Sequence, residues 1–212
     1  MNNKIIYSDD CSGFVRLRTY LPEAVLEIRY AADNNFIGER IDGYEAPEAW
    51  LSIEAAAALK QASDELAGKG YALKIFDAYR PQMAVDHFVR WAGDLTDIRK
   101  KAEYYPELEK KEIIPLGYVA EHSSHTRGST ADLTLISRQT GEELDMGGSF
   151  DYFGERSHFS YTGITQEQKN HRILLRDVMI RHGFAPLAEE WWHFTLCDEP
   201  YPDTYFTFPV RG

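Results

Sequence analysis

The sequence is short of cysteine, of long apolar runs and of basic residues, and each shortage excludes a class of protein. Only two cysteines, Cys11 and Cys197, occur among 212 residues, and they lie near opposite ends of the chain. A scaffold held by several disulfides and a Cys-x-x-Cys metal or redox site are therefore excluded. We expect two buried thiols rather than one disulfide between them.

Membranes and nucleic acids are equally poor candidates for partners. No stretch approaches the roughly 18 apolar residues of a membrane span, and residues 1–10 are too acidic for a secretory signal. The chain has 23 Lys and Arg against 34 Asp and Glu, a formal net charge of −11. Because phosphate groups are bound by clustered basic residues, we expect no nucleic-acid partner. These features predict a cytoplasmic protein and leave a homo-oligomer open.

The patterns along the chain predict one α+β domain over residues 1–212, with a central, mostly antiparallel sheet flanked by helices. Hydrophobic residues make up 43% of the chain, enough for a sizeable core, and no linker or repeat divides it. Ser52 caps a helix that ends near Gly68, and Thr165 with Gln168 forms a capping box for a helix that Gly183 ends. The other predicted elements are a helix from Pro81, a charged helical excursion over 94–112, and strands over 71–78, 129–136 and 184–196.

Common phosphate-binding and hydrolase motifs are absent from the sequence. It contains no GxxxxGK[ST], GxGxxG, GxSxG or HExxH. A serine hydrolase is the weaker alternative, because several serines surround His122 and His125 but nothing places one of them on a strained turn.

The stretch 123–132 is the first segment whose residue types suit a metal site. His125 precedes a turn that contains Gly128, and Asp132 follows on the polar face of a predicted strand. Imidazole and carboxylate are both zinc ligands, and a third protein ligand would leave one open catalytic position. Taken alone, such a pair is more often a surface hydrogen bond.

Glu190 and His193 form the second segment, on either side of two tryptophans. The simplest interpretation is a core strand with one hydrogen-bonded histidine. In a regular strand the two side chains would face opposite sides, because their offset is odd. They can serve one site only if the chain bends between them.

Arg80 is the third candidate, between a predicted buried strand and Pro81. A residue before proline is kept out of helical backbone angles, which can aim this side chain into a cleft. A guanidinium near zinc would stabilise the oxyanion that forms when water attacks a carbonyl. The alternative is an ordinary ion pair with one of the many acidic side chains.

Together these segments resemble one known family closely, from Tyr30 to His193. The chain is similar to the VanX-type D-alanyl-D-alanine dipeptidases, in the zinc D,D-peptidase group that shares its fold with Hedgehog signalling domains. Four motifs in the same order carry the resemblance: Tyr79-Arg80-Pro81, Ser123-x-His125-x-x-Gly128…Asp132, Asp145-Met146-Gly147…Phe150-Asp151 and Glu190-x-Trp192-His193.

The resemblance implies a hydrolase that cleaves free D-alanyl-D-alanine with metal-activated water. It assigns one zinc ion per chain to three ligands, which are His125, Asp132 and His193. Glu190 would be the general base and Arg80 would stabilise the tetrahedral intermediate. Three further residues would contact the dipeptide: Asp151 and Tyr30 near its amino group, and Ser123 near its carboxylate.

Two other functions fit the same fold. One is a zinc D,D-carboxypeptidase or another peptidoglycan-trimming amidase, which would act outside the cytoplasm. The other is a non-catalytic zinc-binding domain. The presence of both Glu190 and Arg80 argues against the latter, because a purely structural zinc would need neither.

Overall fold

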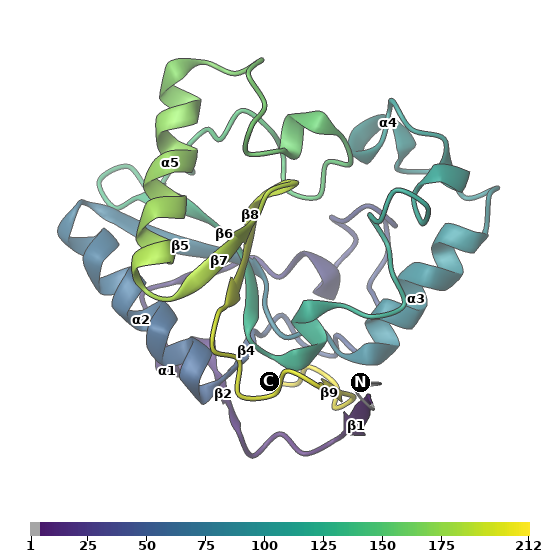
Figure 1. The fold of residues 1–212 in the computed structure, drawn as a ribbon, viewed down its shortest axis with the longest axis horizontal. Helices are drawn as coiled ribbons and strands as arrows, with labels where there is room; N and C mark the ends of the chain where they lie inside the picture. Colours follow the sequence, from purple (N-terminus) through teal and green to yellow (C-terminus); the bar gives the residue numbers. More distant parts are fainter. Residues whose placement is uncertain (1–4) are drawn as a thin grey trace.

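A five-stranded sheet lies at the centre of the computed structural model, which describes residues 5–212 (Figure 1). Its strand order is β3-β5-β6-β8-β7. β3 runs parallel to β5, and the other neighbouring pairs are antiparallel. The strands are β3 (Val25–Leu26), β5 (Tyr71–Asp77), β6 (Thr130–Ser137), β7 (Phe184–Leu187) and β8 (Glu190–Leu196). The predicted α+β class with a mostly antiparallel sheet is confirmed.

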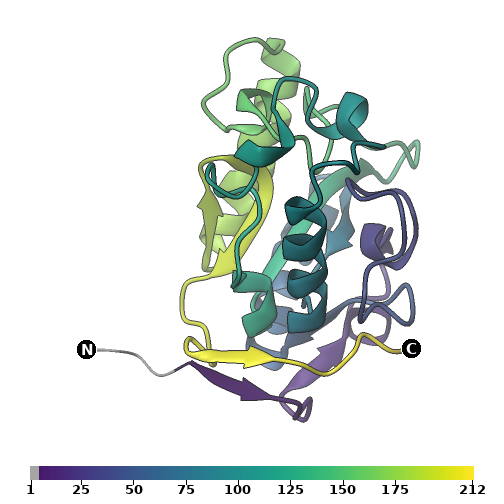
Figure 2. The same ribbon diagram turned by 90° about the vertical axis from the view of Figure 1, so that its right-hand side faces the viewer.

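Helices lie on both sides of this sheet. α2 (Ile53–Gly68) and α5 (Gln166–Arg181) pack against each other and against one face, whereas α3 (Gln82–Gly93) stands across from the opposite face (Figures 1 and 2). Ser52 Oγ accepts a hydrogen bond from the Ala55 amide, and Thr165 forms the expected capping box with Gln168. These local signals fix where α2 and α5 begin.

Short elements complete the fold around the sheet. β1 (Ile6–Ser8) pairs in parallel with β9 (Thr204–Phe206), and β2 (Phe14–Arg16) pairs antiparallel with β4 (Trp50–Ser52). The short helices are α1 (Leu17–Tyr20), α4 (Lys101–Tyr104), η1 (Arg29–Ala31), η2 (Lys110–Glu112), η3 (Ser124–Arg127) and η4 (Glu155–Ser157). Within residues 5–212, no helix combines the length and apolar character that crossing a membrane requires.

Three predictions from the sequence differ from the structure. The strand expected over 184–196 is two strands, β7 and β8, joined by a tight turn. The segment 94–112 contains only the short helices α4 and η2, and α4 ends just before Pro106, which disfavours helical angles at the residue preceding it. Both cysteines, Cys11 and Cys197, are free but exposed rather than buried, because they lie in surface segments outside the core strands and helices.

The turn between η3 and β6 packs directly on an aromatic cluster. The ring of Phe14 contacts the rings of Tyr79, Phe206 and Phe208 at centroid distances of 5.4, 4.7 and 5.0 Å. Gly128 has a φ of +82°, and a Cβ there would lie 2.2 Å from the Phe14 ring. Glycine is therefore required at this position for two reasons, its backbone conformation and the space available.

Replacing Gly128 by alanine tests this packing, with Gly141→Ala as a matched control. Gly141 also has a positive φ, of +74°, but no atom lies within 4 Å of its would-be Cβ. The control should lose about 1–2 kcal/mol of unfolding free energy from the left-handed conformation alone. Gly128→Ala should lose about 2–5 kcal/mol, because overpacking adds to the same strain. Urea unfolding in a metal chelator measures both, and equal losses would contradict the packing argument.

Candidate active site

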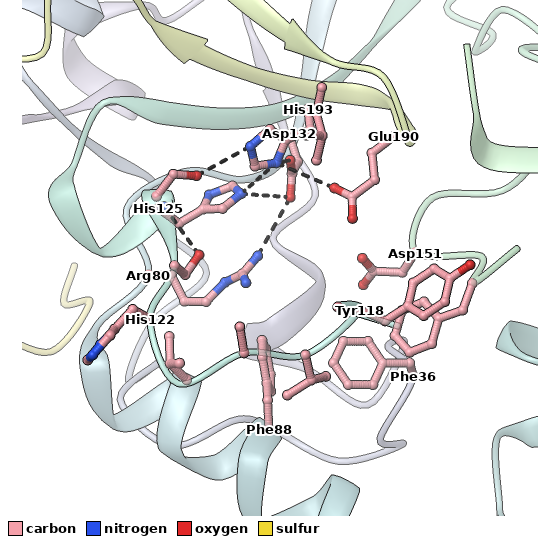
Figure 3. Close-up of a pocket in the computed structure, with 18 of the residues that line it drawn as sticks. Phe36, Arg80, Phe88, Tyr118, His122, His125, Asp132, Asp151, Glu190 and His193 are labelled. Atoms are coloured by element: carbon pink, nitrogen blue, oxygen red, sulfur yellow. Dashed lines mark hydrogen bonds and ion pairs between the residues drawn. The ribbon is translucent and has the colours of Figure 1, made fainter. Parts of the chain in front are cut away.

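A cavity of about 250 Å³ opens between the sheet and α3 (Figure 3). One side of it is charged, and the other is apolar and aromatic. All eight of the residues singled out in the sequence line it: Tyr30, Arg80, Ser123, His125, Asp132, Asp151, Glu190 and His193. The aromatic side is formed chiefly by Phe36, Phe88, Tyr118 and Phe153.

Three side chains converge at the charged end of the cavity. The register of β6 and β8 places Asp132 directly opposite His193, and η3 brings His125 against the start of β6. His125 Nε2 lies 3.2 Å from Asp132 Oδ2, and His193 Nδ1 lies 3.1 Å from Asp132 Oδ1. The two imidazole nitrogens are 3.3 Å apart. One potential ligand atom from each residue lies within 4.8 Å of the other two, as in a site that could hold a metal ion.

The hydrogen bonds around these residues suit metal ligands. His125 Nδ1 donates to the carbonyl oxygen of Ala78 at 2.7 Å, which leaves the lone pair of Nε2 pointing at the cluster. His193 Nε2 lies 3.3 Å from Ser124 Oγ and 3.4 Å from Thr195 Oγ1. Donation to these hydroxyls leaves the lone pair of Nδ1 for a ligand.

The surroundings of Asp132 show best that this cluster suits a metal ion. Its Oδ1 is buried and accepts no hydrogen bond from any residue in 5–212. Burial alone would raise the pKa of Asp132, but the proximity of His125 and His193 outweighs it and holds the pKa below its ordinary value. An ionised carboxylate and two imidazole lone pairs facing one another form a nitrogen- and oxygen-donor set that suits zinc.

Glu190 reaches the same cluster because β8 bends. Pro186 pairs with Phe194, but the next residue of β7, Leu187, pairs with Glu190, so β8 has three residues where β7 has none. This bulge cancels the odd offset, and Glu190 Oε2 lies 3.4 Å from His193 Nδ1. The bend that the sequence required is present. Burial raises the pKa of the Glu190 carboxyl.

Arg80 faces the cluster from the end of β5. Its Nε donates to Asp77 Oδ2 at 2.9 Å, and its Nη2 lies 3.7 Å from Asp132 Oδ2. The guanidinium carbon also lies 5.0 and 5.1 Å from the ring centroids of Tyr30 and Phe88, which pack against each other at 5.1 Å. A planar cation that is hydrogen-bonded to a carboxylate and packed against two rings has little freedom, so its remaining N–H groups have a fixed direction.

Asp77 is a residue that sequence reasoning missed. It is fully buried, and its second oxygen accepts a 2.6 Å hydrogen bond from the Tyr44 hydroxyl. Its place at the end of a buried strand, three residues before Arg80, was the available signal. The hydrogen bond to Tyr44 could not be predicted in this way, because Tyr44 and Asp77 are far apart in the sequence.

Asp151 lies across the cavity from Arg80, and its carboxylate points inward (Figure 3). The Tyr30 hydroxyl donates to Asp151 Oδ2 at 2.8 Å. Burial, reinforced by the charge of Asp132, raises the pKa of Asp151 well above its ordinary value. A carboxyl in this setting favours a cationic partner.

Ser123 has a local structural contact. Its Oγ accepts a hydrogen bond from the His125 amide at 3.3 Å and so caps η3. The hydroxyl proton remains free to donate into the cavity, which Ser123 lines. The neighbouring Ser124, which sequence reasoning passed over, contacts His193 instead.

Known proteins resemble this chain over most of its length. The family model for peptidase M15, described as D-ala-D-ala dipeptidase, matches residues 10–211. A D-alanyl-D-alanine dipeptidase of Enterococcus faecalis (strain V583) is 45% identical over 199 residues, covering 94% of this chain and 98% of the relative. The enzyme of the same name from Streptomyces coelicolor is 42% identical and covers 87% and 91%. That of Escherichia coli K12 is 32% identical and covers 88% and 86%.

Solved structures show more distant likenesses. VanYB in complex with D-alanine-D-alanine is 14% identical, with a TM-score of 0.44 over 73% of this chain and 75% of that one. The LdcB LD-carboxypeptidase is 19% identical, with a TM-score of 0.45 over 91% of this chain and 71% of that one.

The ligand cluster predicts one zinc ion per chain. Replacing His125 by alanine removes one of three ligands, so the purified variant should lose most of its zinc after dialysis. His122→Ala is the matched control, because His122 lies three residues earlier on the cavity rim and outside the cluster. Elemental analysis should give about one zinc per chain for wild type and control. Equal zinc in all three proteins would contradict the ligand assignment.

Proposed function

The chain belongs to the D-ala-D-ala dipeptidase family of the M15 peptidases, and we propose that its cavity hydrolyses the peptide bond of free D-alanyl-D-alanine with zinc as cofactor. One observation carries the proposal. A single cavity contains a three-ligand cluster, a carboxylate 3.4 Å from one ligand and a second, buried carboxylate opposite. The first two features suit hydrolysis, and the third suits a substrate with a free amino group.

His125, Asp132 and His193 are the proposed zinc ligands. When bound, zinc acts as a Lewis acid that polarises the scissile carbonyl and makes water a stronger acid. The hydrogen bonds from His125 to Ala78 and from His193 toward Ser124 orient the two imidazoles for this role. These contacts support one zinc per chain.

Glu190 is the proposed general base. It takes a proton from the attacking water and delivers it to the nitrogen of the leaving D-alanine. Two features support this role: its carboxylate lies beside the ligand cluster, and burial raises its pKa toward the range in which a base also serves as an acid.

Arg80 is proposed to stabilise the oxyanion of the tetrahedral intermediate. Its contact with Asp77 and the rings of Tyr30 and Phe88 fix the guanidinium before substrate arrives. A donor oriented in advance needs little rearrangement as negative charge develops on the carbonyl oxygen.

The two ends of the dipeptide are assigned to opposite sides of the cavity. Asp151, held by Tyr30, is proposed to bind the ammonium group, and Ser123 with neighbouring backbone amides to bind the carboxylate. Wild-type specificity then follows from charge, because an N-acylated substrate would bury Asp151 without a cation. This distinguishes the dipeptidase from a D,D-carboxypeptidase, whose N-terminal subsite must accept a longer peptide.

Two broader assignments accompany this proposal. A contiguous hydrophobic core and a family match over residues 10–211 support one dipeptidase domain for residues 1–212. The cytoplasmic location and the absence of a nucleic-acid partner remain predictions from the sequence.

Replacing Glu190 by glutamine tests the proposed base. The amide keeps the shape of the side chain but cannot accept the proton, so turnover of D-Ala-D-Ala should fall roughly 100- to 10,000-fold. Zinc content should stay at the wild-type level, because Glu190 is outside the ligand set. Glu189→Gln is the matched control, since that neighbour is exposed and lies outside the cavity. A Glu190→Gln variant within a few-fold of wild type would place the base elsewhere.

Free and N-acetylated D-Ala-D-Ala test the proposed substrate. Acetylation removes the ammonium group and leaves Asp151 unpaired, at a penalty of about 2–5 kcal/mol, so kcat/KM should drop roughly 30- to several-thousand-fold. Steady-state kinetics with both dipeptides and the wild-type protein measure this ratio. Similar values would indicate an open N-terminal subsite and favour the carboxypeptidase.

A further inference from the structure

The segment that carries Asp151 is attached to one face of α5. Gln168 Nε2 donates to Asp145 Oδ2 at 2.8 Å, and His171 Nδ1 donates to the Asp145 carbonyl oxygen at 2.8 Å. Arg172 Nε donates to the carbonyl oxygen of Met146 at 2.6 Å. Positions 168, 171 and 172 share a helix face, so all three side chains hold the start of the same segment.

Arg172 also holds the end of this segment. Its Nη2 donates to the Arg156 carbonyl oxygen and its Nη1 to the His158 carbonyl oxygen, both at 2.9 Å. One guanidinium therefore joins Met146 to residues 156–158, and the chain between them forms a closed loop with Asp151 inside it. The rigid fork of arginine fixes these three carbonyls relative to one another, which a lysine ammonium would not do.

The surroundings of Arg172 are unusual for a charged side chain. The residue is 1% exposed, and its described hydrogen-bond partners are all backbone carbonyls rather than carboxylates. Its guanidinium lies 5.8 Å from the ring centroid of Trp191, the residue after Glu190. Burial lowers its pKa to about 10, so the group stays charged at neutral pH. Burying a charged group without an opposite charge costs free energy, which indicates that the positions of the three carbonyls held by Arg172 matter for function.

Asp151 needs that geometry. Its φ of 60° makes it the one non-glycine residue with a positive φ in residues 5–212. A residue in this region keeps its conformation only where the surrounding structure determines it strongly. Phe150 contributes by packing against Phe76 and Trp192, at centroid distances of 4.7 and 5.3 Å. Arg172 donates hydrogen bonds to both ends of the loop, and no other side chain in residues 5–212 is described as doing so.

We infer that Arg172 is a positioning residue for recognition of the substrate ammonium group. It does not line the cavity, and it acts by holding the 146–158 loop so that Asp151 points at that group. The inference rests on the proposed assignment of Asp151 to the ammonium. It adds a specificity determinant on α5, on the far side of the loop from the substrate.

Kinetics of Arg172→Met and Arg172→Lys with free and N-acetylated D-Ala-D-Ala test this inference. Arg172→Met should raise KM for the free dipeptide about 10- to 100-fold, because a misplaced carboxylate loses its contact with the ammonium. Its kcat should stay within about threefold of wild type, and the preference for the free dipeptide should fall with the rise in KM. For Arg172→Lys, KM for the free dipeptide should lie between the values for the wild type and Arg172→Met. Zinc content should not change.

Arg181→Met is the matched control. Arg181 lies on the same helix, but it is exposed and pairs with Glu65 on α2, so its kinetics should equal those of wild type. Hydrogen exchange gives a readout that does not depend on turnover. Amides in 146–158 should exchange faster in Arg172→Met than in wild type or Arg181→Met.

The outcomes separate this inference from the proposed function. Wild-type protein without a preference for the free dipeptide contradicts the proposed function. A wild-type preference that folded Arg172→Met retains contradicts the inference alone. Loss of zinc, or an equal loss of kcat on both substrates, shows a general structural role and also overturns it. So does failure of both Arg172 variants to fold, because Arg172 would then be a determinant of folding.

Discussion

The Asp132 carboxylate between two imidazoles is the interaction on which the rest of the site depends. Its contacts of 3.2 and 3.1 Å to His125 and His193 bring together groups whose free lone pairs face one another in a buried place. That arrangement is unfavourable without a cation. It requires β6 and β8 to be adjacent, η3 to precede β6 closely, and the Ala78 carbonyl to hold one ring.

Charges of opposite sign alternate around the cavity, and both the proposed selectivity and the proposed chemistry depend on this pattern. Arg80 lies between Asp77 and Asp132, whereas Asp151 has a hydroxyl partner but no described cation at hydrogen-bond distance. In an environment of low polarity each buried charge needs a partner. Under the proposed assignment, a zwitterionic dipeptide supplies its ammonium group to the carboxylate that lacks a cation, so binding of the substrate also balances this charge.

Local signals in the sequence predicted much of the fold. Ser52 and Thr165 marked the starts of α2 and α5 because a helix cap depends on neighbouring residues only. The bend in β8 was not predictable in the same way, because a bulge arises from pairing with another strand. The alternation of side chains along a sequence describes a regular strand without a bulge. The same limit applies to Asp77 with Tyr44 and to Arg172, whose partners are distant in the chain. The ligand residues came from the ordered motifs of a resemblance, and the structure brings those residues together.

An anomalous difference map at the zinc absorption edge, from crystals of the zinc-loaded protein, would locate the metal and identify its ligands. We expect one strong peak per chain, coordinated by His125 Nε2, His193 Nδ1 and the Asp132 carboxylate at about 2.0–2.2 Å. Glu190 should lie beside this peak without coordinating it. A peak bound by other residues, or one coordinated through His125 Nδ1, would contradict this ligand set.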